Sequence, residues 1–214
     1  MAVFFFAYVT AAIGFVIGQS IGGTDSYAAQ CAGLVGLWAG LIPGSVFVSR
    51  VRTGLPFPEA VGLRFRLPFD LIGLPVGIVC TYLLDFFYWV ASHWIHHLQT
   101  EASKPAKELT QNAHGFGFFV FAILLVVGAP VVEEIFYRGL LLRSLKRYLS
   151  PTLAVVVCGV VFGAAHLNLV TLAGLAGFGI VLAYLANRFG RLGPNILAHS
   201  AFNLVAVIGL WAAR

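Results

Sequence analysis

The stretch GFGFFVFAILLVVGAPVVEEIFYR, residues 115–138, decides the fold class of this chain. Its apolar run is long enough for a helix to cross a hydrocarbon core about 30 Å thick. Its apolar residues do not alternate with polar ones, as they would along a half-buried strand. Because a bilayer offers no water to unpaired backbone amides, such a run is predicted to be a membrane-spanning helix.

The rest of the chain has the same character. Of its 214 residues, 60% are hydrophobic and 10% are charged, a composition well outside that of water-soluble domains. Apolar stretches of spanning length recur, separated by polar or glycine-containing turns. The predicted spans are residues 3–22, 28–49, 68–92, 115–138, 152–167, 170–188 and 194–212. The predicted fold is therefore an all-α, multi-pass transmembrane bundle of about seven helices.

The chain has a net charge of +5, and its basic residues lie mainly in the segments that flank the predicted helices. This distribution argues against a nucleic-acid partner, which would favour one basic domain. With a cytoplasmic amino terminus, nine basic residues fall in inner loops and three in outer segments, as the positive-inside rule favours. The inner set is Arg50, Arg52, Arg64, Arg66, Arg143, Lys146, Arg147, Arg188 and Arg191; the outer set is Lys104, Lys107 and Arg214.

The fourth predicted span carries charges at a depth where charges are costly, so each needs a partner, a water-filled cavity or a function. Glu133 and Glu134 project about 100° apart on a helix and must have different roles. Glu134 and Arg138 are four residues apart, the spacing at which a carboxylate and a guanidinium pair. That pairing leaves Glu133 free to face a cavity.

Two further spans carry histidines that geometry brings to a similar depth. If the fourth and fifth spans form a hairpin turning at Ser150 and Pro151, Glu133 and His166 lie within roughly 3 Å of the same height in continuous helices. His199 lies roughly 8 Å into the last span, on the same side. Asn203, four residues later, shares its helix face. We therefore expect these side chains to converge.

The third predicted span contains two aspartates. Asp70 follows Pro68 and is predicted to be a first-turn charge favoured by the helix dipole. Asp85 lies mid-span and is predicted to face the bundle, where it would make a structural hydrogen bond.

The segments EExxxR (133–138), FxxxH (162–166) and HxxxN (199–203) together resemble the pattern of the CPBP family of intramembrane proteases. This family includes type II CaaX prenyl endopeptidases and bacterial bacteriocin-processing or immunity-associated relatives. The resemblance covers roughly residues 115–210. It predicts a CPBP-like catalytic transmembrane core in residues 115–214, preceded by residues 1–114 as transmembrane helices of unassigned role.

The resemblance also implies roles for the polar residues. Glu133 would be the general base, with His166 helping to hold and activate the attacking water. His199 and Asn203 would stabilise the oxyanion, and Glu134 and Arg138 would orient the site. Members of the family have also been described as metal-dependent. In that account Glu133, His166 and His199 would be zinc ligands, but the metal-free mechanism is preferred because the chain has no HExxH pair.

These features predict an intramembrane endopeptidase acting on a membrane-associated protein or peptide. The alternatives are a noncatalytic membrane partner or immunity protein on the same fold, and a proton-coupled transporter, since buried Glu and His chains also serve proton relays. The sequence has no inverted repeat of the transporter kind. The short chain and compact loops favour a bacterial plasma membrane.

Overall fold

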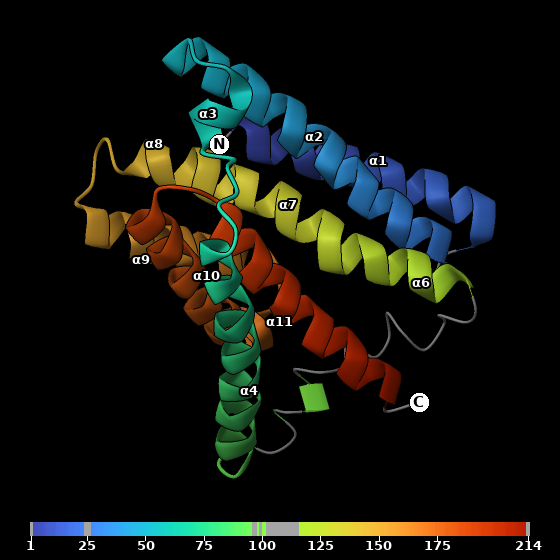
Figure 1. Cartoon of the computed structure of the whole chain (residues 1–214). Helices are drawn as coiled ribbons and strands as arrows, with labels where there is room; N and C mark the ends of the chain where they lie inside the picture. Colours follow the sequence, from blue (N-terminus) through green and yellow to red (C-terminus); the bar gives the residue numbers. More distant parts are fainter. Residues whose placement is uncertain (1, 24–26, 96–97, 99, 102–115, 213–214) are drawn as a thin grey trace.

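The computed structural model describes residues 2–23, 27–95, 98, 100–101 and 116–212, and every regular element in these ranges is a helix. The predicted all-α bundle is therefore confirmed. The helices are α1 (Ala2–Gly22), α2 (Tyr27–Thr53), α3 (Phe57–Val61), η1 (Phe69–Ile72), α4 (Gly73–Ser92), α6 (Phe116–Ile123), η2 (Leu124–Gly128), α7 (Ala129–Glu134), η3 (Ile135–Leu142), α8 (Arg143–Leu145), α9 (Pro151–Ala164), α10 (Leu169–Phe189) and α11 (Gly193–Ala212) (Figure 1). Lys104, Lys107 and Arg214, which entered the charge comparison, lie outside the described residues.

Each predicted span corresponds to a helical segment. Within the described residues, five segments are long and apolar enough to cross a membrane: Ala2–Gly22, Ala28–Thr53, Phe69–Ser92, Gly117–Leu145 and Leu169–Phe189. The fifth predicted span is the shorter helix α9, of 14 residues, and the last is α11, of 20 residues. A chain with these helices is an integral, multi-pass membrane protein.

The fourth span is a single rod from α6 to α8 that includes π-helical turns at η2 and η3 (Figure 1). Pro130 gives a reason for the first of them, because proline has no amide hydrogen and its ring clashes with the carbonyl four residues earlier. Side chains of other helices bond to carbonyls in these turns. Asn203 donates to the Leu125 carbonyl at 2.8 Å, and the Cys158 thiol donates to the Tyr137 carbonyl at 3.3 Å. The wide turns thus fix neighbouring helices to the rod.

Helices α1 and α2 form a close hairpin beside this rod (Figure 1). A Cβ at Gly18 would lie 2.3 Å from the Ala28 carbonyl oxygen, so this glycine is required for the approach. The hairpin contacts the rod through Trp38, whose ring would lie 2.2 Å from a Cβ at Gly128. The aromatic rings of Phe4 and Phe136 also stack, with centroids 5.9 Å apart. The amino-terminal helices therefore pack against the carboxyl-terminal core.

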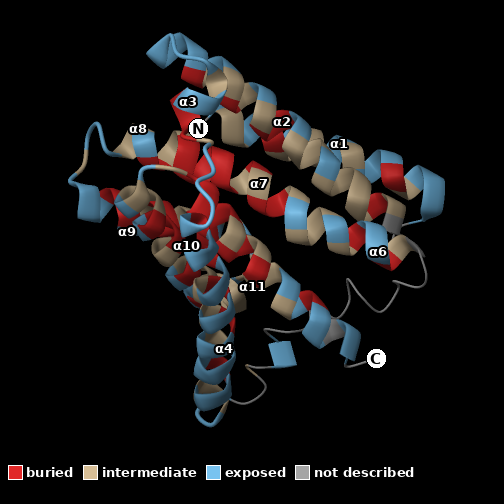
Figure 2. Ribbon diagram, in the orientation of Figure 1, coloured by how far each residue is buried: buried red, intermediate tan, exposed pale blue. Residues whose placement is uncertain are grey.

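The core lies where α7, η3, α9, α10 and α11 converge, and Figure 2 shows buried residues concentrated there. Helix α9 packs on α10 at Gly159 and Gly163, where a Cβ would lie 2.4 Å and 2.6 Å from backbone nitrogens of α10. Helix α4 packs on α11 at Gly73 and Gly77, and its second half contacts α10 through Leu84 and Tyr88. Most other side chains of that second half are exposed (Figure 2).

Asp85 does not face the bundle, so that prediction is wrong. The buried residues of α4 are Gly73, Gly77, Thr81 and Tyr88, whereas Asp85, between Thr81 and Tyr88 along the helix, is exposed. The cause is the divergence of α4 from the other helices, which leaves few neighbours for its second half (Figure 1).

Candidate active site

Glu134 and Arg138 form a buried ion pair, as their spacing predicts. Arg138 Nη1 donates to Glu134 Oε1 at 2.8 Å, and both side chains are fully shielded. Arg138 Nη2 donates to the Gly179 carbonyl of α10 at 2.9 Å. Its guanidinium carbon lies 4.6 Å from the centroid of the Phe162 ring. The guanidinium therefore ties the rod to both α9 and α10.

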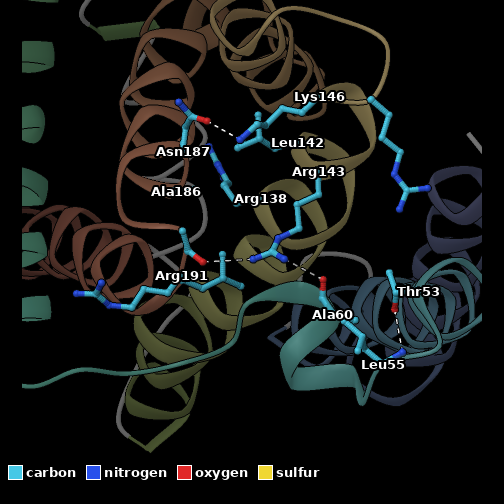
Figure 3. Close-up of a pocket in the computed structure, with 13 residues that line it drawn as sticks. Thr53, Leu55, Ala60, Arg138, Leu142, Arg143, Lys146, Ala186, Asn187 and Arg191 are labelled. Atoms are coloured by element: carbon cyan, nitrogen blue, oxygen red, sulfur yellow. Dashed lines mark hydrogen bonds between the residues drawn. The ribbon is translucent and has the colours of Figure 1, made fainter.

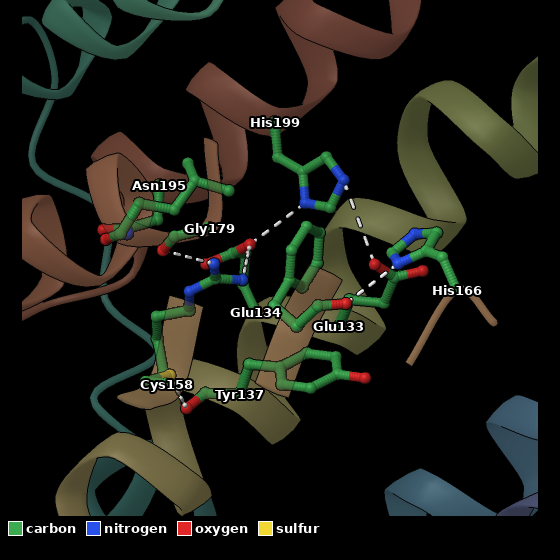
Figure 4. Close-up of polar contacts among 11 residues, drawn as sticks. Glu133, Glu134, Tyr137, Cys158, His166, Gly179, Asn195 and His199 are labelled. Atoms are coloured by element: carbon green, nitrogen blue, oxygen red, sulfur yellow. Dashed lines mark hydrogen bonds and ion pairs between the residues drawn. The ribbon is translucent and has the colours of Figure 1, made fainter. Parts of the chain in front are cut away.

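His199 contacts both glutamates across helices (Figure 4). Its Nδ1 lies 3.0 Å from Glu134 Oε1, and its Nε2 lies 3.9 Å from Glu133 Oε2. An ionised carboxylate only accepts hydrogen bonds, so the Nδ1 of His199 must carry the proton in this contact. In the neutral ring the lone pair is then on Nε2, which is directed toward Glu133.

Glu133 lines a cavity of about 300 Å³ between the amino-terminal hairpin and the core. Its Oε2 atom is buried and has no hydrogen-bond partner among the described residues. The polar side chains around the cavity are Tyr8, Glu133, Tyr137, His166, His199 and Asn203; the apolar ones include Phe4, Leu37, Leu41, Leu125, Leu175, Phe178 and Phe202. The cavity therefore combines a carboxylate without a hydrogen-bond partner on Oε2 with a mostly apolar wall.

His166 reaches this cavity from a turn rather than from a helix. Helix α9 ends at Ala164, and His166 lies in the turn that follows, so the prediction of a span reaching residue 167 was too long. His166 Nδ1 donates to the Phe162 carbonyl at 2.9 Å, because a carbonyl only accepts, and this leaves Nε2 available. The prediction that Glu133 and His166 lie at the same height assumed two continuous α-helices. The helices are not continuous, yet both residues line the same cavity.

The turn that carries His166 is held at both ends. Leu167 has a φ of 52°, the left-handed region that non-glycine residues rarely adopt. Asn168 caps α10 by accepting from the amides of Val170 and Thr171, at 2.9 Å and 3.1 Å. On the other side, the Tyr8 hydroxyl of α1 donates to the Ala165 carbonyl. The position of His166 therefore depends on α1 as well as on α9.

Asn203 also lines the cavity, one turn beyond His199 on α11. One hydrogen of its Nδ2 is used by the Leu125 carbonyl, which fixes the carboxamide against η2. The second amide hydrogen and the Oδ1 atom remain for the cavity. Glu133, His166, His199 and Asn203 are thus brought together, and the catalytic roles assigned to them stay predictions.

The zinc alternative concerns the same three side chains. Among the residues that the structure describes, no group of three or more His, Cys, Asp or Glu side chains is arranged to hold a metal ion. His199 Nδ1 is directed at Glu134, as the second ring nitrogen of a metal-bound histidine often is, and His199 Nε2 lies 3.9 Å from Glu133 Oε2. Zinc binding by Glu133, His166 and His199 stays a prediction.

Sequence reasoning missed Tyr8 and Tyr137 as residues of the site. Both line the cavity with Glu133, and Figure 4 shows the Tyr137 ring in the same cluster. Tyr137 precedes Arg138 and follows the glutamates by one turn, a spacing that could have indicated it. Tyr8 has no such signal, because the pairing of α1 with a turn 157 positions away is purely tertiary.

Asp70 has a different role from the one predicted. It is fully buried in η1 and pairs with Arg191, whose Nη2 lies 2.6 Å from Asp70 Oδ1. Asp70 also accepts from the Arg66 amide at 2.5 Å. The aspartate is therefore held by an ion pair rather than by a helix dipole, and it anchors the loop that leads into α11 and His199.

The comparison with protein families gives a match over the carboxyl-terminal part of the chain. Residues 115–205 match a family model described as type II CAAX prenyl endopeptidase Rce1-like. No curated protein and no solved structure gives a significant match. The matched range includes the segments of all four cavity residues predicted from the sequence.

Proposed function

We propose that this chain, whose residues 115–205 match the Rce1-like family model, is an intramembrane endopeptidase that uses a glutamate-activated water. The observation that carries the proposal is the meeting of Glu133, His166, His199 and Asn203 in one cavity. The substrate would be a membrane-associated protein or peptide.

In this mechanism Glu133 takes a proton from water. Its Oε2 atom is buried and unpaired, so no existing hydrogen bond must be broken before it accepts the proton. His166 presents Nε2 to the cavity, since its Nδ1 is bonded to Phe162, and can accept a hydrogen bond from the same water. The water oxygen then bonds to the scissile carbonyl carbon.

The resulting oxyanion requires hydrogen-bond donors. Asn203 has one free amide hydrogen for this purpose. His199 can donate from Nε2 only as an imidazolium, because its other proton is committed to Glu134. That imidazolium would lie between two carboxylates, 3.0 Å from Glu134 Oε1 and 3.9 Å from Glu133 Oε2.

The reaction closes when Glu133 passes its proton to the amide nitrogen. The carbon–nitrogen bond then breaks, the new carboxyl and amino ends separate, and the Glu133 carboxylate is regenerated. No metal is used in any step. The ion pair of Glu134 with Arg138 keeps the His199 ring in the required orientation throughout.

The cavity wall suggests the chemical class of the substrate. Leucine and phenylalanine side chains from α1, α2, α10 and α11 line most of it, so a segment with apolar side chains near the scissile bond is favoured. We place the amino terminus in the cytoplasm of a bacterial plasma membrane, on the loop-charge pattern. The active site then lies toward the inner leaflet.

The direct test compares the wild-type chain with Glu133→Gln in the same membrane. Membrane-associated peptides with and without a carboxyl-terminal isoprenyl group are supplied, and the products are identified by mass spectrometry. Glutamine keeps the shape of the side chain but removes the base, so we expect defined products to vanish. The substrate class is then defined by which peptides are cleaved, those with the isoprenyl group or those without it.

The matched control is Glu59→Gln, because Glu59 is an exposed glutamate that does not line the cavity. This variant should cleave at the wild-type rate. If wild type and Glu133→Gln give the same peptide profile with every substrate, the proposal fails. The noncatalytic membrane partner would then be the better account of the fold.

A further inference from the structure

A second cavity, of about 490 Å³, lies where the ends of α2, α8 and α10 meet (Figure 3). It is separate from the candidate active site, although Arg138 lines its inner wall. Its lining residues are Thr53, Leu55, Ala60, Arg138, Leu142, Arg143, Lys146, Arg147, Ala186, Asn187, Gly190, Arg191 and Leu192. The set contains five cations and no carboxylate.

Two of the five cations are neutralised elsewhere. Arg191 turns away from the cavity in Figure 3 and pairs with Asp70. Arg138 pairs with Glu134 on its active-site side. Arg143, Lys146 and Arg147 remain, and no ion pair with a carboxylate is found for them within the described chain.

Arg143 is fixed in place by neutral acceptors. Its Nη1 donates to the Ala60 carbonyl at 3.2 Å, and its Nη2 donates to the Gly190 carbonyl at 3.4 Å. A Cβ at Gly62 would lie 2.0 Å from Nη2, so a side chain there would displace the guanidinium from this position. The charge is therefore held in a defined position without being neutralised.

Lys146 and Arg147 add charge on the same side of the helix end. They follow Arg143 by three and four residues, the spacing that brings side chains together on one face, where like charges repel. Lys146 Nζ donates to Asn187 Oδ1 at 2.7 Å, another neutral acceptor (Figure 3). Such a cluster is stabilised by a bound anion.

Arg138 supplies an independent observation. Its side chain is 1% exposed and its Nε atom has no hydrogen-bond partner among the described residues. A buried guanidinium with an unused donor on a cavity wall is costly unless a ligand satisfies it. Membrane orientation accounts for basic residues on a loop, but it does not require a cavity or an unsatisfied buried donor.

We propose that this basic cavity binds a phosphate group, carried either by a phospholipid headgroup or by a free phosphate. Guanidinium groups match phosphate oxygens in geometry and charge, and an ammonium adds a mobile donor. The inference is independent of peptidase activity, since it rests only on the cavity and its charges. Bound phosphate next to Arg138 would also connect this site to Glu134 and His199.

The test titrates the detergent-purified full chain with phosphatidylglycerol or phosphatidylcholine and counts bound lipids by native mass spectrometry. We expect tighter binding of phosphatidylglycerol. In Arg143→Gln/Lys146→Gln that binding should weaken by about 10-fold to 100-fold, the loss expected for charge-assisted hydrogen bonds. Inorganic phosphate is then added as a competitor. If inorganic phosphate displaces phosphatidylglycerol, the cavity is a site for free phosphate. If the lipid stays tightly bound, the cavity is a site for a phospholipid headgroup.

The control removes the same charge from the last turn of α2. Arg50→Gln/Arg52→Gln lies outside the cavity, and both residues are exposed, so its lipid binding should equal that of wild type. Lys146→Gln alone changes one exposed residue and guards against a folding defect in the double variant; it should show part of the loss. Equal affinity in the cavity variants and wild type, or an equal loss in the control, would overturn the proposal.

Discussion

Replacing Glu134 by glutamine should destabilise the protein strongly, because it leaves a buried charge without its partner. Arg138 is 1% exposed and Glu134 is fully buried, and Nη1 and Oε1 are 2.8 Å apart. In Glu134→Gln the guanidinium would keep the Gly179 carbonyl as its remaining charge-stabilising acceptor. The substitution preserves side-chain volume, so packing contributes little to the change.

Removal of one partner of a buried ion pair costs about 3–5 kcal/mol. For a chain of this size each kcal/mol lowers the unfolding temperature by roughly 2–4 °C, which gives an expected drop of roughly 6–20 °C. His199 adds to the effect, because its Nδ1 loses a charged acceptor at 3.0 Å.

Thermal unfolding in detergent can be followed through the thiol of Cys158, which is 0% exposed in the folded chain. A maleimide fluorophore reacts with it only on unfolding. Cys31 and Cys80, which are less buried, are first replaced by alanine to remove their signal.

Two further variants test whether the loss of stability comes from the broken ion pair or from any substitution in the site. Glu133→Gln should change the free energy of unfolding by less than about 1 kcal/mol, because Glu133 makes no close ion pair. Glu134→Gln/Arg138→Met removes both charges and should be more stable than Glu134→Gln alone. If Glu134→Gln unfolds at the wild-type temperature, the buried pair does not hold the site, and the reasoning is refuted.

Other consequences can be measured separately. Tyr8→Phe should lower kcat several-fold without unfolding the chain, since it removes the hydrogen bond of about 0.5–1.5 kcal/mol that holds the turn carrying His166; an unchanged kcat would contradict this role. Gly18→Leu should lower the free energy of unfolding by about 1–3 kcal/mol or more, because its side chain would enter the Ala28 backbone; circular dichroism on heating measures this. Asp70→Asn should lower the unfolding temperature, because it leaves the largely buried Arg191 guanidinium without its carboxylate partner; an equal temperature would show that the pair contributes nothing. Cleavage should survive dialysis against EDTA, and restoration of a lost activity by Zn²⁺ would favour the metal mechanism instead.

Local features of the sequence predicted a large part of the fold. The lengths of the apolar runs predicted helices, and turn residues located their ends to within a few positions. Two details of the helices differ from the prediction, for local reasons that hydropathy does not indicate. Helix α9 ends three residues before the predicted limit because the chain turns at His166, and the fourth span widens into π-helix before Pro130.

Spacing along one helix also predicted the pair of Glu134 with Arg138, because residues four apart share a face whatever surrounds them. Spacing along one helix does not predict which residues pair between different helices. His199 touches Glu134 across 65 positions, Asp70 pairs with Arg191 across 121, and Tyr8 bonds to Ala165 across 157. A sequence specifies which face of a helix is polar, whereas the packing of the whole bundle selects the neighbour that meets it. The same packing left Asp85 exposed and made the amino-terminal helices, which lie outside the matched family range, a wall of the candidate active site.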